Sequence, residues 1–571
     1  MSAFAIASLL RWRPSPFTLS IILAVTVGLI SGLAAVIFRK LIDFFHRLFF
    51  VDLQGLLSAI GNISVILLPA FGGMIVGLLV YFFAREAKGH GVPEVMLAVA
   101  KNGGRIRGRV SIVKALASSI CIGSGGSVGR EGPIVQVGAA LASFLGQLVG
   151  ISENWLRVLV ACGAAGGISA TFNAPIAGVF FALEVILGTF SVQNFGMVVL
   201  SSVIADVAGQ TFLGNVPAFD VPAYALTSYW ELGLYALLGL VSAFLGTAFL
   251  HLLYIIEDWF DEMRRVPEYI RPALGGLMLG VIGFFTPQIF GVGYAAISLA
   301  LLGKYSFFLL VALALLKPLA TSLTLGSGGS GGVFAPSLFI GAMGGTALGM
   351  IFHSVVPEIA GPAGGYGLVG MAAVFASAAW APITAILIIF ELTRDYSIML
   401  PLMLATVIST GVSHLLTREN IYTLKLARRG INLHQFRRSD PADSLPIREV
   451  MTQNYPTVSS DCSVEDLSAA FERTGVHGFP VLDADDNLIG IVTAGDVERA
   501  LLDGSDGLTA QEIASRSLLV AHPEQTLGEL VGRIGAEVGY IPVVDRDHPK
   551  RLLGMLRRHD IIGAYARAQR R

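Results

Sequence analysis

The segment KALASSICIGSGGSVGREGPIVQVGA (residues 114–139) recurs in the same chain as KPLATSLTLGSGGSGGVFAPSLFIGA (residues 317–342). Without a gap, half of the aligned positions are identical. Two more pairs follow the same order: GHGVPEV (89–95) with GVGYAAI (291–297), and NAPIAGVFFALE (173–184) with WAPITAILIIFE (380–391). Three collinear matches indicate an internal duplication, which is typical of transporter folds that hold their sites between two repeats.

The composition predicts that both copies lie in a membrane. Hydrophobic residues make up 54% of the chain and charged residues only 14%, against roughly 25% charged residues in soluble domains. Apolar runs at residues 20–37, 63–83 and 232–254 approach the about 20 residues that a helix needs to cross a bilayer. We therefore predict an all-α polytopic membrane domain over residues 20–428, with repeats at about 20–215 and 230–428.

The composition changes near Gly430, after which the charge content becomes that of a soluble α/β segment. We predict a linker at residues 429–445 and two related copies at residues 446–504 and 505–571. Each copy reads as strand, acidic turn, strand and helix: FPVLDADDNLIGIVTAGDVERALL begins at Phe479 and IPVVDRDHPKRLLGMLRRHDIIGAY at Ile541.

Basic residues follow the last apolar segment, namely Arg418, Lys425, Arg428, Arg429, Arg437 and Arg438. The positive-inside rule then places the tail in the cytoplasm. Residues 1–19 carry Arg11 and Arg13 and lack a signal-peptide cleavage pattern. We expect this segment to be cytosolic too, in a multi-pass protein of a cell membrane, for which a bacterial inner membrane is the working assignment.

Three glycine-rich segments, GHGVP, GSGGSVGREGP and GSGGSGGVFAP, interrupt the apolar sequence. Broken helices at membrane depth are tolerated where the freed backbone lines a cavity or is buried in protein. The proline after each glycine cluster suits the first turn of a new helix. Converging helix N-termini would bind an anion through free N–H groups. The alternative is that these glycines only allow close helix packing.

Glu131 is an ionisable residue within the predicted membrane region, which is a functional hypothesis by default. A carboxylate beside an anion pathway would compete with the anion for the same N–H groups, and protonation would release it. Its counterpart in the second repeat is Phe334. The alternative role is an Arg130–Glu131 ion pair that holds a loop.

GHGVPEV, GREGP, GGVFAP and ENIYT, together in this order, resemble the CLC family of chloride channels and chloride/proton antiporters. The resemblance implies antiparallel repeats and a homodimer with one pore in each subunit. It implies that Glu131 is the gate and that Lys114 favours anions in the pore. The anion-binding residues that we predict are His90, Gly91, Arg130, Gly332, Val333, Phe334 and Tyr422.

His90 departs from the family pattern, which usually has serine at the middle of the first motif. A neutral imidazole can donate one N–H to an anion, and a protonated one would bind it tightly. His90 would then alter anion preference or make transport pH-dependent. The alternative is that the ring turns away and backbone N–H groups suffice.

A second departure lies at the coupling position, where FALEVI keeps Glu184 and has Val185 in place of the second glutamate of proton-coupled relatives. A valine cannot relay protons, so this sequence favours a passive chloride channel. A chloride/proton antiporter that uses another path, through His90 or water, stays open.

The tail resembles a tandem CBS pair, a fold that often binds adenine nucleotides such as ATP or AMP. By resemblance, Thr493 contacts phosphate and Asp496 holds ribose hydroxyls. The second copy keeps Asp560 but has Arg557 at the Thr/Ser position. The alternative is a module that serves only dimerisation.

Other classes fit less well. A CBS-based sensor with a membrane anchor would need neither repeated Gly-Pro breaks nor a buried glutamate. The sequence lacks a nucleophile–base pair and a Walker loop, so we expect no enzyme, no required cofactor and no nucleic-acid partner. Cys121, Cys162 and Cys462 lack metal-ligand spacing and are expected to be packing residues. Fluoride specialisation is a minor variant.

Overall fold

The computed structural model describes residues 16–56, 61, 63–190, 192–215, 226, 228–431, 445–503, 507–531 and 539–568. The chain forms two compact units, Met1–Leu433 and His434–Arg571. The division between them falls inside the predicted linker. Arg11, Arg13, Arg437 and Arg438 lie outside the described residues.

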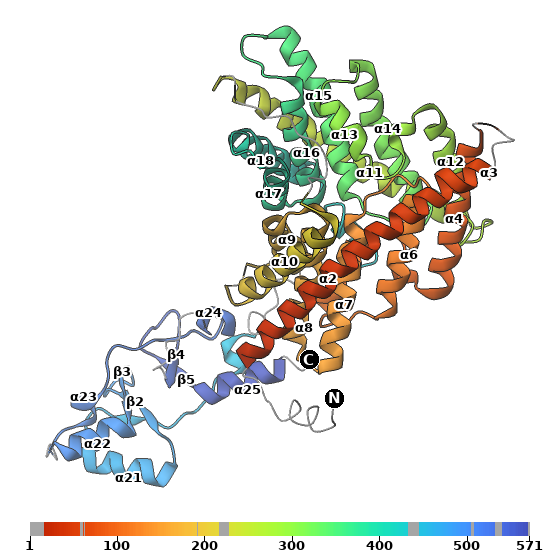
Figure 1. The fold of residues 1–571 in the computed structure, drawn as a ribbon. Coiled ribbons are helices and arrows are strands. Elements are labelled where there is room, and N and C mark those ends of the chain that lie inside the picture. Colours follow the sequence, from red (N-terminus) through yellow and green to blue (C-terminus); the bar gives the residue numbers. More distant parts are fainter. Residues whose placement is uncertain are drawn as a thin grey trace. The chain divides into compact units, whose positions relative to one another are not determined.

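The first unit is helical throughout its described part (Figure 1). Its first half contains α2 (Pro16–Arg47), η1 (Leu48–Leu53), α3 (Gln54–Leu56), α4 (Ser64–Phe83), η3 (Arg85–Ala87), α5 (Val92–Lys101), α6 (Arg109–Gly123), α7 (Glu131–Val149), α8 (Glu153–Phe172), α9 (Pro175–Phe181), η4 (Ala182–Leu187) and α10 (Val192–Leu213). Its second half contains α11 (Glu231–Glu262), α12 (Arg271–Phe285), η5 (Pro287–Ile289), α13 (Tyr294–Leu301), α14 (Phe307–Gly326), α15 (Phe334–Val355), α16 (Ala363–Ala379), α17 (Pro382–Thr393) and α18 (Met399–Leu416), followed by α19 (Thr423–Ala427).

Within the described ranges, nine helices are long and apolar enough to cross a membrane. The two halves match element for element, with α4 to α10 corresponding to α12 to α18 and α2 corresponding to α11. The predicted membrane bundle with an internal duplication is therefore confirmed.

Packing of α4 against α12 shows the relative direction of the repeats. A Cβ atom added to Gly73 would lie 2.2 Å from the carbonyl oxygen of Pro272. One added to Gly276 would lie 2.2 Å from the carbonyl oxygen of Pro69. Pro69, which precedes Gly73 on α4, thus contacts Gly276, and Pro272, which precedes Gly276 on α12, contacts Gly73. The two helices therefore run antiparallel. Glycine permits this close backbone approach because it has no side chain.

Two glutamates show the same reciprocal arrangement. Glu184, on η4, accepts hydrogen bonds from the backbone N–H groups of Ile383 and Thr384 at the start of α17, at 3.2 and 2.9 Å. Glu391, on α17, accepts from the N–H groups of Ile176 and Ala177 at the start of α9, at 2.9 and 2.7 Å. Each carboxylate satisfies N–H groups that a helix start leaves unpaired. The exchange of partners indicates a two-fold relation between the repeats, and the antiparallel packing of α4 against α12 shows that the repeats are antiparallel.

The second unit contains two copies of one small α/β pattern. The first has η7 (Ile447–Glu449), β1 (Val458–Ser459), α21 (Val464–Thr474), β2 (Gly478–Leu482), β3 (Leu488–Thr493) and α22 (Ala494–Leu502). The second has α23 (Ala510–Ile513), α24 (Leu527–Val531), β4 (Tyr540–Val544), β5 (Leu552–Arg557) and α25 (Arg558–Ala568).

Strands β2 and β3 pair antiparallel, as do β4 and β5, and β1 adds to β2 in parallel. Both hairpins shift register at the same place, between Val481 and Leu482 and between Val543 and Val544. A shared irregularity of this kind identifies the two copies as one folding pattern used twice, as the sequence predicts.

Candidate functional site

Three helix N-termini meet between the repeats, where α5, α7 and α15 begin. The loop before α5 pairs with the loop before α15, because the N–H of Gly89 donates to the carbonyl oxygen of Gly329 at 3.0 Å. The loop before α7 also pairs with the loop before α15, through two hydrogen bonds between Gly129 and Gly332, at 2.8 and 2.6 Å. A Cβ atom on Gly132 would lie 2.3 Å from the carbonyl oxygen of His90. The three positive helix ends therefore share one small region.

The pairing of Gly129 with Gly332 has a consequence for the predicted anion site. Each of these glycines donates its N–H to the carbonyl oxygen of the other. The Gly332 N–H is thus used within the protein, and this glycine acts by bringing the loops together. Its neighbours Val333 and Phe334 are buried at the start of α15. Phe334 packs against Phe172 and Phe375, with ring centroids 5.3 and 4.1 Å away.

Two buried lysines support the loops from behind. Lys114 donates from its ammonium group to the carbonyl oxygens of Ala87 and Gly89, at 3.0 and 2.6 Å. Lys317, its counterpart in the second repeat, donates to the carbonyl oxygens of Ile289 and Gly291, at 2.9 and 2.8 Å. Lys114 therefore fixes the GHGVP loop and adds a positive charge beneath it.

His90 lies in this loop with its side chain buried at 2% exposure. Neither ring nitrogen has a hydrogen-bond partner within the described part of the chain. The centroid of its ring lies 5.9 Å from that of Tyr422, which is 1% exposed. Buried polar atoms are usually hydrogen-bonded, so this unpartnered imidazole indicates a place for a ligand or water. Gly91 follows with φ +83°, in a conformation that favours glycine.

Glu131 begins α7 with a side chain that is 1% exposed. Its Oε1 accepts a hydrogen bond from the Tyr294 hydroxyl at 2.5 Å. Its Oε2 has no partner among the described residues. A Cβ atom on Gly129 would lie 2.3 Å from this Oε2 and 3.1 Å from the backbone nitrogen of Ala335. The carboxylate thus lies between the first turns of α7 and α15.

Among the described contacts, Arg130 forms no ion pair with Glu131. The sequence left such a pair open as the alternative role of these two residues. Its guanidinium group lies over the ring of Tyr294, 5.2 Å from the centroid, and its Nη2 donates to the carbonyl oxygen of Thr171 at 3.4 Å. Its Nε is buried without a partner in the described chain. Arg130 therefore lies beside the Glu131 side of the site and orients Tyr294.

Tyr294 is a residue that the sequence reasoning misses. It occupies the place in GVGYAAI that Val92 occupies in GHGVPEV, so the comparison of the repeats could have drawn attention to it.

The coupling position lies on a different element from the gate residue. Val185 is buried at 4% exposure on η4, and the adjacent Glu184 caps α17.

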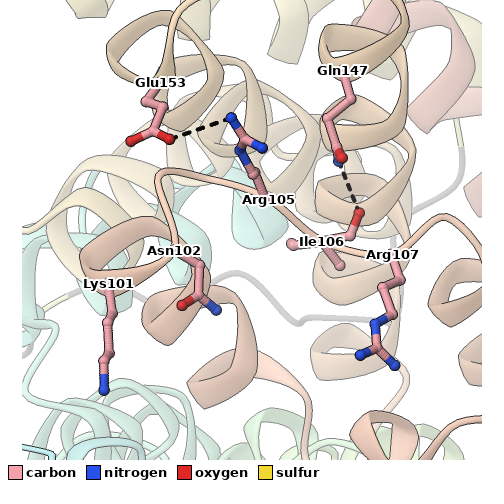
Figure 2. Close-up of a pocket in the computed structure, with 7 residues that line it drawn as sticks. All are labelled: Lys101, Asn102, Arg105, Ile106, Arg107, Gln147 and Glu153. Atoms are coloured by element: carbon pink, nitrogen blue, oxygen red, sulfur yellow. Dashed lines mark hydrogen bonds and ion pairs between the residues drawn. The ribbon is translucent and has the colours of Figure 1, made fainter.

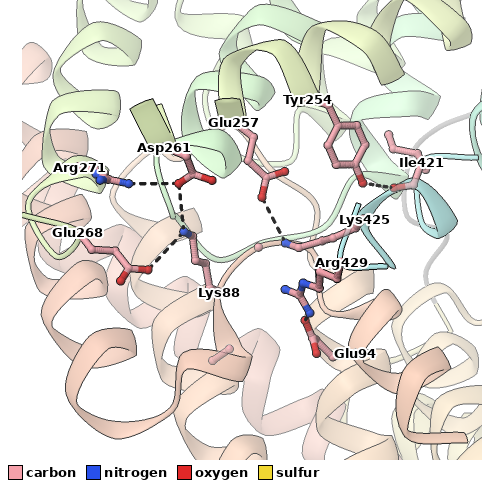
Figure 3. Close-up of polar contacts among 12 residues, drawn as sticks. Lys88, Glu94, Tyr254, Glu257, Asp261, Glu268, Arg271, Ile421, Lys425 and Arg429 are labelled. Atoms are coloured by element: carbon pink, nitrogen blue, oxygen red, sulfur yellow. Dashed lines mark hydrogen bonds and ion pairs between the residues drawn. The ribbon is translucent and has the colours of Figure 1, made fainter. Parts of the chain in front are cut away.

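A cluster of opposite charges lies around α19 and the loop that contains Lys88 (Figure 3). Lys88 lies 3.4 Å from Glu268, and Arg429 lies 2.7 Å from Glu94. Lys425 lies 3.7 Å from Glu257. Sequence reasoning used Lys425 and Arg429 only to assign membrane orientation, and it did not single out Lys88.

A surface pocket of about 580 Å³ contains none of the predicted site residues. It is lined by residues of the α5–α6 loop and the α7–α8 region: Lys101, Asn102, Arg105, Ile106, Arg107, Gln147 and Glu153 (Figure 2). Arg105 pairs there with Glu153 at 3.4 Å. The region between the helix N-termini is therefore distinct from this open pocket.

In the tail, both predicted ribose-binding aspartates hold contacts within their own copy. Asp496 accepts from the hydroxyl of Thr493 at 2.6 Å and from Arg499 at 2.5 Å. Asp560 accepts two hydrogen bonds from the Arg557 guanidinium group, at 2.8 and 3.0 Å. Burial raises the pKa of the Asp560 carboxyl, but the hydrogen bonds and charge of Arg557 outweigh burial and lower it overall. Arg557 thus occupies the carboxylate that a ribose would need.

Comparisons with known proteins agree with this architecture. A family model described as voltage gated chloride channel matches residues 72–414, and a CBS domain model matches residues 447–503 and 510–567. The putative chloride channel protein ClcB-like of Ralstonia nicotianae is 33% identical, over 70% of this chain and 95% of its own length. The H(+)/Cl(-) exchange transporter ClcA of Vibrio parahaemolyticus is 32% identical, over 72% of this chain and 90% of its own length.

Two solved structures are also similar. The crystal structure of a slow cyanobacterial Cl-/H+ antiporter aligns with a TM-score of 0.67 at 25% identity, covering 72% of this chain and 97% of that chain. A eukaryotic CLC transporter aligns with a TM-score of 0.62 at 21% identity, covering 95% of this chain and 97% of that chain. The second likeness concerns the fold alone, and it extends over both units.

Proposed function

This chain belongs to the voltage-gated chloride channel family, the CLC anion transporters, and on that premise we propose that it carries chloride between the N-termini of α5, α7 and α15 under the control of Glu131. The observation that carries this proposal is the position of the Glu131 carboxylate. One of its oxygens is unpartnered within the described chain and lies between the first turns of α7 and α15. A carboxylate there takes the place that a chloride ion would occupy.

Competition between Glu131 and chloride makes the carboxylate a gate. In its ionised form it is attracted by the same helix ends that attract an anion. On protonation it loses that attraction, and a chloride ion can replace it. Tyr294 donates a hydrogen bond to the other carboxylate oxygen, which favours the ionised, closed form and holds the side chain in place.

Chloride binding below the gate involves His90, Gly91, Val333, Phe334 and Tyr422. The buried, unpartnered imidazole of His90 supports this assignment, since either ring nitrogen can donate to an anion when it carries a proton. Lys114 adds attraction without direct contact, because its donors are used by two loop carbonyl groups. Binding through N–H dipoles with a distant cation is weak enough for release, as conduction requires.

We favour passive conduction over proton-coupled exchange. Val185 is buried and cannot carry a proton, and both oxygens of the adjacent Glu184 are bonded at the start of α17. Coupled exchange is the second candidate, and the similarity to the Vibrio H(+)/Cl(-) exchange transporter and to the cyanobacterial antiporter favours it. In that case protons would pass by way of His90 or water.

We further propose that both termini face the cytoplasm and that the protein is a homodimer with one pore per subunit. In the tail, we propose that Thr493 and Asp496 contribute to an adenine-nucleotide site. Basic residues around α19 support the orientation by the positive-inside rule. Both aspartates are bonded within their own copy, so a nucleotide would have to displace Arg499 from Asp496 or Arg557 from Asp560.

The test is chloride efflux from liposomes that contain the full-length protein, with external pH recorded at the same time. Passive conduction predicts chloride flux that moves no protons against a pH gradient. Proton uptake in fixed ratio to chloride would contradict passive conduction and establish exchange. An absence of chloride flux from correctly assembled protein, with fluoride or nitrate carried instead, would overturn chloride as the substrate.

A further inference from the structure

Lys425 differs from the other basic side chains in the α19 charge cluster (Figure 3). Arg429 is bonded to Glu94 at 2.7 Å and Arg271 to Asp261 at 3.1 Å, both within hydrogen-bonding distance. The ammonium group of Lys425 lies 3.7 Å from Glu257. We find no hydrogen bond from this group to the part of the chain that the structure describes.

Lys425 is also deeply buried, with 10% of its side chain exposed. The side chain of Glu257 is 18% exposed. Removing two charges from water is costly, and good hydrogen-bond geometry is needed to offset that cost. A loose, buried pair is therefore a poor stabilising device, which suggests that the Lys425 ammonium group has another partner in the working protein.

The position of this ammonium group points to that partner. A Cβ atom on Gly89 would lie 2.6 Å from the Lys425 nitrogen, so the ammonium group lies against the GHGVP loop, one residue from His90. Lys425 follows Tyr422 by three residues on α19. Any anion that reaches the His90–Tyr422 region from the α19 side comes close to this ammonium group.

Gly89 cannot use the donors of Lys425 itself. Its carbonyl oxygen already accepts from Lys114 and from the N–H of Gly331, at 2.6 and 3.3 Å. An ammonium group carries three donors, so Lys425 keeps capacity for a small anion while it is attracted to Glu257.

We propose that Lys425 is an anion-handling residue at the α19-side entrance of the passage, and that Glu257 is a built-in competitor for its ammonium group. A chloride ion entering from this side replaces the Glu257 carboxylate beside Lys425 and then moves on to the His90–Tyr422 site. The ligand class is small monovalent anions. This inference rests on the proposed function and adds a second carboxylate–anion competition, at the opposite end from Glu131.

The experiment measures initial chloride flux against chloride concentration on the α19 side, with full-length protein in liposomes. Lys425→Gln should raise the apparent KM for chloride about tenfold, because a nearby attracting charge is lost. Glu257→Gln should lower the apparent KM, because Lys425 loses its competitor. Arg428→Gln, which breaks the more exposed Arg428–Asp258 pair on the same helix, is the matched control and should leave the KM unchanged.

The charge swap Lys425→Glu with Glu257→Lys separates anion handling from a structural ion pair. Anion handling predicts an assembled protein whose KM stays high, since a carboxylate now lies beside Gly89. Restoration of the parent KM by the swap would overturn the proposal, as would a rise in KM for Glu257→Gln. If Lys425→Gln does not fold, two milder variants decide the question. Lys425→Arg keeps a cation at this position, and Glu257→Gln removes only the competing carboxylate.

Failure of this inference is distinguishable from failure of the proposed function. If the KM is insensitive to Lys425 and Glu257 while Glu131→Gln still alters the pH dependence of flux, only the inference about the α19-side entrance is wrong.

Discussion

The two repeats of the membrane unit share their supporting contacts and differ where they face the site. Lys114 and Lys317 each donate to two carbonyl oxygens of the equivalent loop. Glu184 and Glu391 each cap a helix of the other repeat.

The residues that would handle the anion have no such symmetry. The counterpart of Glu131 is Phe334, and that of His90 is Val292. The difference teaches that the duplication repeats the supporting contacts, whereas the proposed gating carboxylate occurs in one repeat only. Substitutions at matched positions can therefore separate support from function.

The largest effect is expected from Glu131→Gln, which imitates the protonated gate. Flux should become insensitive to pH, and the apparent affinity for chloride should rise about tenfold or more, because a competing charge is removed. The measurement is liposome flux between pH 4.5 and 8. Phe334→Leu, at the matched position of the second repeat, should keep the parent pH profile, and an unchanged profile in Glu131→Gln would rule out this gate.

Replacing each buried lysine by methionine should separate support from function. Lys114→Met and Lys317→Met should both destabilise the protein by about 2–4 kcal/mol, since each leaves buried carbonyl oxygens without their donor. Only Lys114→Met should also weaken chloride binding, because Lys114 lies beneath the GHGVP loop. Thermal unfolding and flux, measured on both variants, check this expectation. Equal losses of chloride affinity in the two variants would contradict it.

His90→Ser should change anion preference with little effect on stability. The imidazole has no partner that its removal would orphan in the described chain. We expect the chloride-to-nitrate flux ratio to change by a few-fold, equivalent to about 1 kcal/mol or less. Val292→Ser is the control in the other repeat. Identical ratios in His90→Ser and the parent would show that the ring does not face the anion.

The smallest effect concerns the tail. Because Arg557 lowers the pKa of Asp560, their interaction stabilises the tail above the unfolded pKa of about 3.9 and is lost as pH falls through the lower folded pKa. Arg557→Ser should therefore cost about 1 kcal/mol or less at pH 7 and less at pH 2. Thermal unfolding of the full chain, followed by circular dichroism at both pH values, checks the sign.

The same variant tests nucleotide binding. Freeing Asp560 should raise the number of ATP or AMP molecules bound per chain in calorimetric titration, and Asp496→Ala should reduce it. If neither the parent nor Arg557→Ser binds a nucleotide, the tail has no regulatory site of this kind.

Much of the fold could be predicted from local sequence. Helix starts within GHGVP, GREGP and GGVFAP follow from glycine and proline, whose backbone preferences are local. The duplication follows from direct comparison, and the tail from two copies of a strand–turn–strand–helix pattern. The candidate gate follows from one ionisable residue in an apolar context.

Contacts between distant segments could not be predicted in this way. Tyr294 and Glu131 are 163 positions apart, and nothing in either segment specifies the hydrogen bond between them. The same holds for Lys425, whose basic charge indicates only membrane orientation until α19 is packed against the GHGVP loop. Arg557 reads as the loss of a phosphate contact, whereas its pairing with Asp560, three residues later, is a local contact that the sequence reasoning overlooked.

The sequence by itself determined that this is a duplicated, membrane-spanning anion transporter of the CLC family with a tandem CBS tail, because period, composition and helix-start chemistry are written in short segments. Only the tertiary structure decided which groups share the passage: the unpartnered Glu131 oxygen between two helix ends, the isolated His90 ring, and Lys425 beside Gly89. These three arrangements depend on how the antiparallel repeats bring residues that are remote in sequence within a few ångströms of one another. At such distances burial and charge determine how the side chains interact.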